Sequence, residues 1–366
     1  MILSKLSVLN YKNITQAEIA CSSKMNCFFG NNGMGKTNLL DAIHYLSFCK
    51  SHIHIPEKQI IHRDEALCVL QGTYDYDGRI EEIFCAMRRE QRKLVKRNQK
   101  AYSKLSEHIG LLPLVMVSPA DAELIRGGSD ERRRLMDVII SQHDKSYLHA
   151  LIQYNKALMQ RNLMLKNQSR DNALYEVLEM QLGMYGRLVY EKRSELIEAF
   201  IPLFNEYYQK ICGESEMVSL QYISQLKEAE LTHLLAASRE RERLVGYTLS
   251  GIHKDDLEMI LDDCLIRYAG SQGQNKTFLI ALKLAQYVFL SSHGVTKPIL
   301  LLDDIFDKLD AGRVEQIIQL VSGDQFGQIF MTDTNRKYLD QILLAINQDY
   351  SLFKVEKGNV LPMHEK

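Results

Sequence analysis

The stretch Gly30-Asn31-Asn32-Gly33-Met34-Gly35-Lys36-Thr37 has the spacing G-x-x-x-x-G-K-T of a phosphate-binding loop. An apolar run at 27–29 precedes it, and residues 37–49 follow it with the apolar pattern of a helix. Glycines let successive backbone N–H groups turn inward around an anion, and the N-terminus of the helix adds positive potential. A glycine-rich turn that contains Lys-Thr by chance would lack these flanks. The stretch therefore predicts a nucleoside triphosphate site between a strand and a helix.

The side chains of this loop have separate expected roles around the triphosphate. Lys36 can reach the β- and γ-phosphates, and the hydroxyl of Thr37 can bind Mg²⁺. We expect ATP to be contacted by the loop and by the residue that follows it, that is by Gly30, Asn31, Asn32, Gly33, Met34, Gly35, Lys36, Thr37 and Asn38.

A second half of this site lies far later in the chain. The run 298–302 is apolar and ends in two carboxylates, Asp303 and Asp304. This is typical of a buried parallel strand whose C-terminal end meets the phosphate loop. We expect Asp303 to hold Mg²⁺ directly or through water, and Asp304 to orient or deprotonate the attacking water. With Lys36, these are the candidate catalytic residues. The alternative, a core strand that merely ends in surface carboxylates, leaves the phosphate loop without a second half.

Composition and charge limit the class of protein. The 366 residues, 46% hydrophobic and 25% charged, are typical of a globular protein large enough for two structural units. The net charge of −1 supplies no global attraction to nucleic acid, so DNA binding would need local basic patches or a surface built by two chains. Seven cysteines without a CxxC pair favour buried, reduced thiols. Without a long apolar run or a cleavable signal, we expect a cytoplasmic protein with no membrane span.

Elsewhere the pattern predicts strands, then helices, then strands again. Residues 66–88 alternate around an Asp77-Gly78 hairpin, and a further strand pair flanks Asn98-Gln99. Helical periodicity dominates from 120 to 244. The other expected helices are 274–291 and 313–322, and the other expected strands are 2–9, 24–29, 247–250, 257–268 and 327–332. A final helix and a short strand pair complete the expected fold.

The segment Gly270-Ser271-Gln272-Gly273-Gln274 is a Ser/Gly turn at the start of a long expected helix. On its own it is explained equally well by a serine that caps the helix. Its position shortly before the Asp303 strand, however, resembles the order in ABC-type ATPases, whose S-x-G-Q signature precedes the acidic strand. The resemblance implies that Ser271, Gln272, Gly273 and Gln274 cap the γ-phosphate of ATP held by a second subunit. It therefore implies an ATP-sandwiched homodimer.

Three features depart from ABC transporters. Asp304 stands where transporters have glutamate, and its shorter side chain favours slow hydrolysis. Thr332-Asp333-Thr334 occupies the place of the switch histidine, and residues 110–121 contain no convincing Q-loop glutamine. Leu309-Asp310, by contrast, resembles the D-loop at the dimer interface.

Because the phosphate loop and the acidic strand share one site, the two ends of the chain form one domain. The expected fold class is α/β: an ABC-type P-loop ATPase head with an antiparallel β subdomain and an inserted helical arm. The head is discontinuous, made of residues 1–120 and 245–366, and the arm is 121–244. Since the heptad register in the arm is not sustained, we expect two antiparallel helices there rather than a long coiled coil.

Several longer motifs resemble the RecF family of bacterial recombination and replication-repair proteins. They are residues 2–13, 117–125, 131–134, 154–162, 250–256, 271–274 and 301–306. The resemblance implies a head like those of chromosome-maintenance ATPases, ATP-dependent dimerisation, DNA binding and weak DNA-stimulated ATPase activity. It also implies partnership with RecR, with RecO downstream, in loading RecA at single-strand gaps, and a place in the SOS response. Asn275 stands where the family usually has a second glutamine.

Two basic clusters, 88–100 and Arg132-Arg133-Arg134, are candidate DNA contacts. Both would suit phosphate contacts without sequence readout, and a solvated charged face explains either one equally well. The family resemblance favours DNA binding for the first cluster. For the second, salt bridges within the arm remain an equal alternative. His253, near Asp255 and Asp256, lacks an evident third metal ligand, so we expect it to have a structural or interface role.

Two other classes of function stay open from the sequence. A P-loop kinase or nuclease-associated ATPase would need a small-substrate pocket or a carboxylate cluster outside the ATP site, and the sequence indicates neither. The intact residues Lys36, Thr37 and Asp303 argue against a structural module with a vestigial ATPase. They are nevertheless compatible with very slow turnover. The favoured hypothesis is an ATP-gated, DNA-binding dimer that hydrolysis resets.

Overall fold

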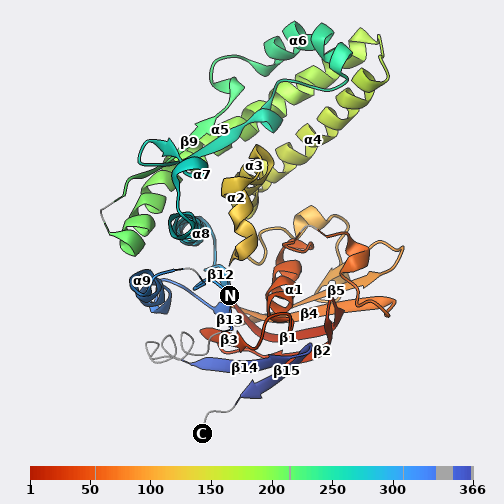
Figure 1. Cartoon of the computed structure of the whole chain (residues 1–366). Coiled ribbons are helices and arrows are strands. Elements are labelled where there is room, and N and C mark those ends of the chain that lie inside the picture. The colour runs from red at the N-terminus through yellow and green to blue at the C-terminus, as the bar shows by residue number, and fades with distance from the viewer. Residues whose placement is uncertain (54, 214–215, 308, 335–348, 364–366) are drawn as a thin grey trace. The chain divides into compact units, whose positions relative to one another are not determined.

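The chain divides into two units in the computed structural model, which describes residues 1–53, 55–213, 216–307, 309–334 and 349–363 (Figure 1). Unit 1 is formed by Met1–Asp121, Lys210–Cys212 and Gln272–Lys366, and unit 2 by Ala122–Gln209 and Gly213–Ser271. The helix expected after residue 334 lies outside the described residues. Within the described residues, no helix is both long enough and apolar enough to cross a membrane.

A six-stranded sheet forms the centre of unit 1. Its strand order is β15-β14-β3-β13-β12-β8, and only β15 is antiparallel to its neighbour. The strands are β3 (Met25–Phe29), β8 (Leu114–Val117), β12 (Ile299–Asp303), β13 (Ile329–Asp333), β14 (Tyr350–Glu356) and β15 (Asn359–Met363). All residues of β12 and β13 are buried, as expected for central strands covered on both faces. Parallel pairing brings the C-terminal ends of β3, β13 and β12 to one edge.

Helices α1 (Lys36–Phe48), α8 (Gln272–His293) and α9 (Ala311–Ser322) also belong to unit 1. The first begins at Lys36, so the last two residues of the phosphate loop already belong to the helix. Nearly all of α1 is buried, including Leu39, Leu40 and Ile43. A helix that is apolar on most sides belongs in the interior of a domain. The phosphate loop is therefore held between two buried elements, β3 and α1.

An antiparallel sheet with the order β2-β1-β4-β5-β6-β7 completes unit 1. Its strands are β1 (Ile2–Tyr11), β2 (Ile14–Ala20), β4 (Leu67–Tyr76), β5 (Arg79–Arg88), β6 (Leu94–Arg97) and β7 (Lys100–Ala101). The predicted hairpins at Asp77-Gly78 and Asn98-Gln99 are confirmed. All four turn residues have positive φ, which is what a two-residue hairpin turn of this kind requires.

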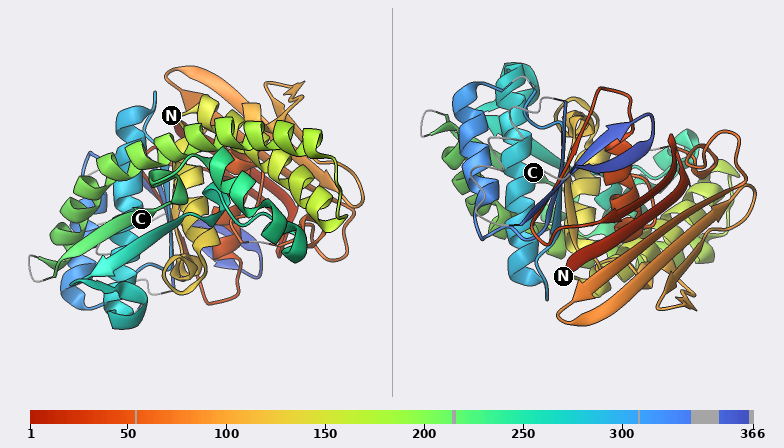
Figure 2. Two further views of the ribbon diagram at one scale, coloured as in Figure 1. Left: turned by 90° about the horizontal axis from the view of Figure 1, so that it is seen from above. Right: turned by 90° about the horizontal axis from the view of Figure 1, so that it is seen from below.

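Unit 2 combines helices with a small sheet. The helices are α2 (Glu123–Arg126), α3 (Ser129–Ser141), α4 (Lys145–Lys166), α5 (Asn172–Cys212, whose last three residues group with unit 1), α6 (Leu231–Val245) and α7 (Ile266–Ala269). Strands β9 (Val218–Ile223), β10 (Asp256–Leu261) and β11 (Cys264–Leu265) form the sheet, in the order β11-β10-β9. The long helices α4 and α5 run side by side (Figures 1 and 2), and a short connection at 167–171 makes them antiparallel.

The strand predicted at 247–250 was wrong. The backbone N–H groups there donate to side chains instead of a neighbouring strand: Thr248 to Asn162 (2.8 Å), Leu249 to Glu242 (2.7 Å) and Gly251 to Gln225 (3.0 Å). Side-chain acceptors thus satisfy the backbone without a sheet.

The division of the chain also differs from the one drawn from the sequence. Residues 245–271, which the sequence pattern assigned to the head, group with unit 2, because β10 pairs along its whole length with β9. Residues 266–268, expected as the end of the strand 257–268, lie instead in the short helix α7.

A buried arginine ties the helices of unit 2 together. The side chain of Arg161 on α4 is fully buried and pairs with Glu179 on α5 (2.9 Å) and Glu242 on α6 (2.5 Å). Its guanidinium also donates to the hydroxyl of Thr248 (2.8 Å). A buried charge is tolerated only with such partners, because its removal from water is costly.

Replacing Arg161 by methionine should lower the free energy of unfolding of unit 2 by about 3–5 kcal/mol, because Glu242 stays buried without its cation. Urea denaturation followed by far-UV circular dichroism measures this change. Arg187→Met is the matched control, since Arg187 forms only exposed ion pairs on α5. Equal midpoints for the two variants would contradict the structural role of Arg161.

Candidate ATP site

The phosphate loop joins the end of β3 to the start of α1 through three glycines of positive φ. Gly30 has φ 153°, Gly33 has φ 79° and Gly35 has φ 111°. A Cβ atom on Gly30 would lie 2.3 Å from the carbonyl oxygen of Val355. On Gly35 it would lie 2.8 Å from the side chain of Asn13. Glycine is therefore required at positions 30 and 35 by both backbone conformation and space.

The ammonium group of Lys36 lies within the loop. Its Nζ donates to the carbonyl oxygens of Gly30 (2.6 Å) and Asn31 (3.0 Å). Burial lowers the pKa of Lys36, while the nearby carboxylates, first of all Asp304, act in the opposite direction. A cation desolvated in this way has few competing water contacts and suits an anionic ligand.

Asp303 links the loop to the neighbouring strand. Its Oδ1 accepts hydrogen bonds from the hydroxyls of Thr37 (2.9 Å) and Thr332 (2.6 Å). Burial raises the pKa of Asp303, and these two hydrogen bonds oppose that shift. The hydroxyl of Thr37 and the carboxylate of Asp303 are hard oxygen donors within hydrogen-bond distance of each other. This donor set fits Mg²⁺, which commonly takes one or two protein oxygens together with phosphates and water.

Asp304, directly after β12, has an unusual backbone. Its φ is 49°, in the left-handed region that non-glycine residues seldom occupy. The N–H of Asp304 donates to both the carbonyl (3.3 Å) and the hydroxyl (3.2 Å) of Thr332. Its own carbonyl accepts a hydrogen bond from Lys276 (3.2 Å). Asp304 is partly exposed, whereas Asp303 is buried, so the two carboxylates have different environments.

The sequence does not predict three contacts that support this site, although it places Thr332 at the switch position. The hydroxyl of Thr332 was not expected to contact Asp303, and Lys276 was not expected to contact Asp304. Asn13 accepts a hydrogen bond from Asn38 (2.7 Å) and donates to the carbonyl of Gly33 (3.2 Å). The amide of Asn38, a candidate ATP contact, thus braces the loop through Asn13. Only the position of Thr332 at the end of a predicted buried strand was a signal in the sequence.

The signature segment falls at the boundary between the two units. Ser271 is the last residue of unit 2, and Gln272 is the first residue of both α8 and the last segment of unit 1. Gly273 and Gln274 lie in the first turn of α8, and the carbonyl of Gly273 accepts from Thr277 (2.9 Å). Within unit 1 the structure brings together the phosphate loop, Asp303 and Asp304, and Ser271 belongs to the other unit.

Some cations of the basic run 88–100 are engaged by partners within the protein, and others are exposed and have no ion pair with the described residues. Arg89 donates to backbone carbonyls of residues 62, 63 and 65, and Arg97 pairs with Glu81 (2.7 Å). Lys93 pairs with Glu57 and donates to the carbonyl of Cys49. The remaining exposed cations of the run, for which the described residues supply no ion pair, are Arg88, Arg92 and Lys100.

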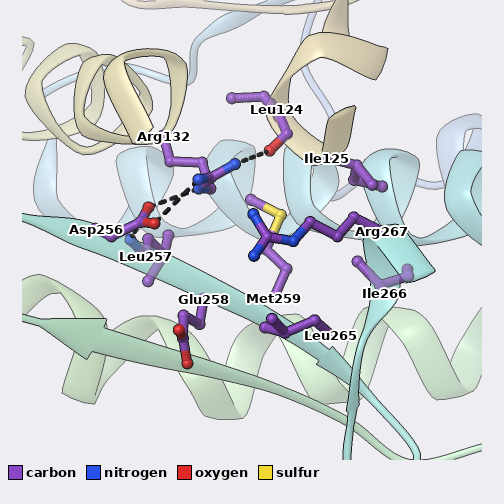
Figure 3. A pocket seen from close by; sticks show the side chains of 10 residues that line it. All are labelled: Leu124, Ile125, Arg132, Asp256, Leu257, Glu258, Met259, Leu265, Ile266 and Arg267. Atoms are coloured by element: carbon purple, nitrogen blue, oxygen red, sulfur yellow. Dashed lines mark hydrogen bonds and ion pairs between the residues drawn. The ribbon is translucent and has the colours of Figure 1, made fainter. Parts of the chain in front are cut away.

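The arginine triplet is engaged within unit 2. Arg132 forms a bidentate pair with Asp256 (2.6 and 3.0 Å) and donates to the carbonyl of Leu124 (Figure 3). Arg133 donates to Asp130 and to the carbonyl of Asp255 (2.5 Å). These contacts support the salt-bridge alternative for the triplet. The hollow drawn in Figure 3 is lined by this ion pair and by apolar side chains of α2 and β10.

His253 has partners at both ring nitrogens. Nδ1 lies 2.8 Å from the hydroxyl of Tyr154, and Nε2 lies 3.2 Å from the carbonyl oxygen of Thr248. Burial lowers the pKa of His253 to about 4. The neighbouring Asp255 pairs with the buried Arg193 (2.8 Å). These contacts agree with a structural role for His253.

The mixed α/β fold carries a phosphate loop, a buried acidic strand and an S-x-G-Q segment before a long helix. This combination defines an ATPase head of the ABC and chromosome-maintenance class. The family model described as "RecF/RecN/SMC N terminal domain" matches residues 2–360. The chain therefore belongs to the RecF branch of this class, the RecF family, as its relatives also show.

Two relatives are similar over the whole chain. The "DNA replication and repair protein RecF" of Parabacteroides distasonis is 74% identical over 365 residues, covering 100% of both chains. The protein of the same name from Bacteroides fragilis is 56% identical over 368 residues, again covering 100% of both.

Solved structures agree with the fold. A structure described as "the recombination mediator protein RecF-ATP in RecFOR pathway" has a TM-score of 0.88 and 27% identity, covering 99% of this chain and 98% of that one. An Smc head domain bound to the C-terminal domain of ScpA, derived from Pyrococcus furiosus, has a TM-score of 0.58 at 17% identity and shares the fold. The predicted fold class is confirmed.

Replacing Gly30 by alanine should weaken ATP binding at least about tenfold, because the added Cβ collides with Val355 and distorts the loop. Isothermal titration calorimetry with ATP and Mg²⁺ measures the affinity. Gly78→Ala is the matched control: Gly78 also has positive φ but lies in a distant hairpin, with nothing within 4 Å of the added atom. We expect that control to lose some stability and to keep its ATP affinity. An unchanged affinity in Gly30→Ala would show that the loop geometry is not required.

Proposed function

We propose that this chain is an ATP-binding protein of DNA replication and repair, in which ATP drives formation of a homodimer that binds DNA. The names of its relatives support the process, and the ATP-bound neighbour supports the nucleotide. The observation that carries the proposal is the hydrogen bond between Thr37 and Asp303, residues separated by 266 positions. It joins the two halves of a nucleotide site at one sheet edge.

In this proposal the phosphate loop and Lys36 hold the β- and γ-phosphates of ATP. Thr37 and Asp303 would hold Mg²⁺, which when bound would neutralise charge on the phosphates. Asp304 orients the attacking water and accepts its proton. The short side chain of Asp304 suits slow hydrolysis. We infer that ATP acts as a conformational switch more than as a substrate for rapid turnover.

The second subunit completes each site. Ser271, Gln272, Gly273 and Gln274 of one copy cap the γ-phosphate held by the other, as the resemblance to ABC-type ATPases implies. ATP then favours the closed dimer because it contacts both copies only in that state. Hydrolysis removes these contacts and releases the dimer.

The closed dimer binds DNA at single-strand gaps and, with RecR and RecO, helps to load RecA in the cytoplasm. The basic run 88–100 supports the DNA contact, with Arg88, Arg92 and Lys100 as the cations available for phosphates. The placement of its near relatives in DNA replication and repair supports the process. A nuclease or small-substrate role has no comparable support.

Lys36→Arg and Ser271→Arg should each abolish ATP-dependent dimerisation, because the first disturbs phosphate binding and the second blocks the cap from the partner copy. Multi-angle light scattering with ATP and Mg²⁺ measures the mass. Ser169→Arg, in the connection between α4 and α5, is the control and should dimerise normally. Normal dimerisation of Ser271→Arg would exclude the shared site.

A triple substitution of Arg88, Arg92 and Lys100 by glutamine should weaken binding to gapped DNA and reduce the salt slope by about 3 if each contacts one phosphate. Fluorescence anisotropy across a range of salt concentrations measures both quantities. The control removes three exposed cations of unit 2, Lys156, Arg170 and Lys227. Equal losses in the two triple variants would indicate that the run 88–100 has no special part in DNA binding.

A further inference from the structure

One lysine joins the signature helix to the backbone of the candidate catalytic carboxylate. Lys276 lies in the second turn of α8, shortly after Ser271. Its Nζ donates to the carbonyl oxygen of Asp304 (3.2 Å) and to that of Asp307 (2.6 Å). An ammonium group has three donors and no acceptor, so two backbone carbonyls are suitable partners. Lys276 therefore fixes the start of the turn that follows β12.

The contact from Lys276 helps to hold Asp304 in an unusual backbone conformation. A non-glycine residue at φ 49° has an uncommon backbone conformation, which persists where its surroundings hold it. Thr332 holds the N–H side of Asp304, through both its carbonyl and its hydroxyl. Lys276 holds the carbonyl side. The direction of the Asp304 side chain is thus set from both sides of its backbone.

The helix that carries Lys276 is rigidly held. From Thr277 to Leu290 nearly every residue of α8 is buried. The hydroxyl of Thr277 also accepts a hydrogen bond from Arg313 on α9 (3.3 Å), whose N-cap residue Asp310 lies just beyond the same turn. Lys276 accordingly reaches Asp304 from a fixed base, as a positioning group must.

We propose that Lys276 is a positioning residue for hydrolysis: it holds Asp304 of its own subunit in the left-handed backbone conformation that directs its carboxylate. This inference rests on the proposed function, because it concerns the same hydrolytic step. It assigns Lys276 to the site of its own chain, although Lys276 lies beside the signature that serves the partner copy.

The first test separates binding from turnover. Lys276→Met removes the donor and keeps a long side chain, and Lys276→Arg restores a donor. In Lys276→Met the turnover number should fall at least about tenfold, because a small misplacement of a catalytic group is costly, whereas ATP affinity should change by less than about twofold. Lys276→Arg should recover most of the turnover. A normal turnover number in Lys276→Met, or a parallel loss of ATP affinity, would overturn the proposal.

The second test asks on which site Lys276 acts. Lys276→Met and Ser271→Ala proteins are mixed in equal amounts and assayed for ATP hydrolysis. Ser271→Ala removes the capping hydroxyl and lacks the bulk with which Ser271→Arg blocks closure of the dimer. If Lys276 serves its own subunit, each mixed dimer keeps one intact site. That site combines Asp304 of the Ser271 variant with Ser271 of the Lys276→Met variant. The mixture should then regain about a quarter of the wild-type rate, because half of randomly assorted dimers are mixed. No regain would indicate that Lys276→Met damages the signature, and would overturn the proposal.

A control mixture of Asp304→Asn and Ser271→Ala tests the shared site by itself. It should regain the same fraction of activity whatever the role of Lys276. Failure of this control counts against the proposed dimer, while the comparison of turnover with affinity in Lys276→Met still decides the role of Lys276.

Discussion

The parallel register of three central strands is the constraint on which the rest of the site depends. It sets Asp303 of β12 opposite Thr332 of β13, and Asp333 of β13 opposite Phe29 of β3. Since the phosphate loop begins directly after β3, the same register brings Thr37 within hydrogen-bond distance of Asp303. A shift of one residue in either pairing would turn these side chains to the other face of the sheet. Packing of fully buried apolar strands therefore fixes the geometry of a polar site.

This site is built from charges held out of water. Burial lowers the pKa of Lys36 and raises that of Asp303, so both ionised forms are disfavoured relative to the same groups in solvent. Two hydroxyls donate hydrogen bonds to Asp303, and two loop carbonyls accept hydrogen bonds from Lys36, which partly offsets that cost. Preorganised groups of this kind act strongly on a bound anion, because they need no rearrangement when it binds. The folded chain thus holds Lys36 and Asp303 in place before a triphosphate binds.

Much of this arrangement was predictable from the sequence because its signals are local. Phosphate binding requires Gly30, Gly35 and Lys36 to lie close together in the sequence. The apolar run that predicts a buried strand likewise stands directly before Asp303. The support of Asp304 by Lys276 and Thr332 was not predictable, since it depends on tertiary contacts between segments far apart in the chain. The strand expected at 247–250 was wrong for a similar reason, because side chains of α4 and α6 accept the hydrogen bonds of its backbone. The six-residue alternation of β9 was present in the sequence but was hidden within a mainly helical region.

We propose that ATP is a dimerisation signal for this chain. The most direct measurement is the mass of the wild-type protein by light scattering with ATP, with ADP and without nucleotide, each with and without gapped DNA. We expect a dimer with ATP, monomers with ADP or without nucleotide, and a further stabilised dimer with ATP and gapped DNA. The same mass in all nucleotide states would contradict it.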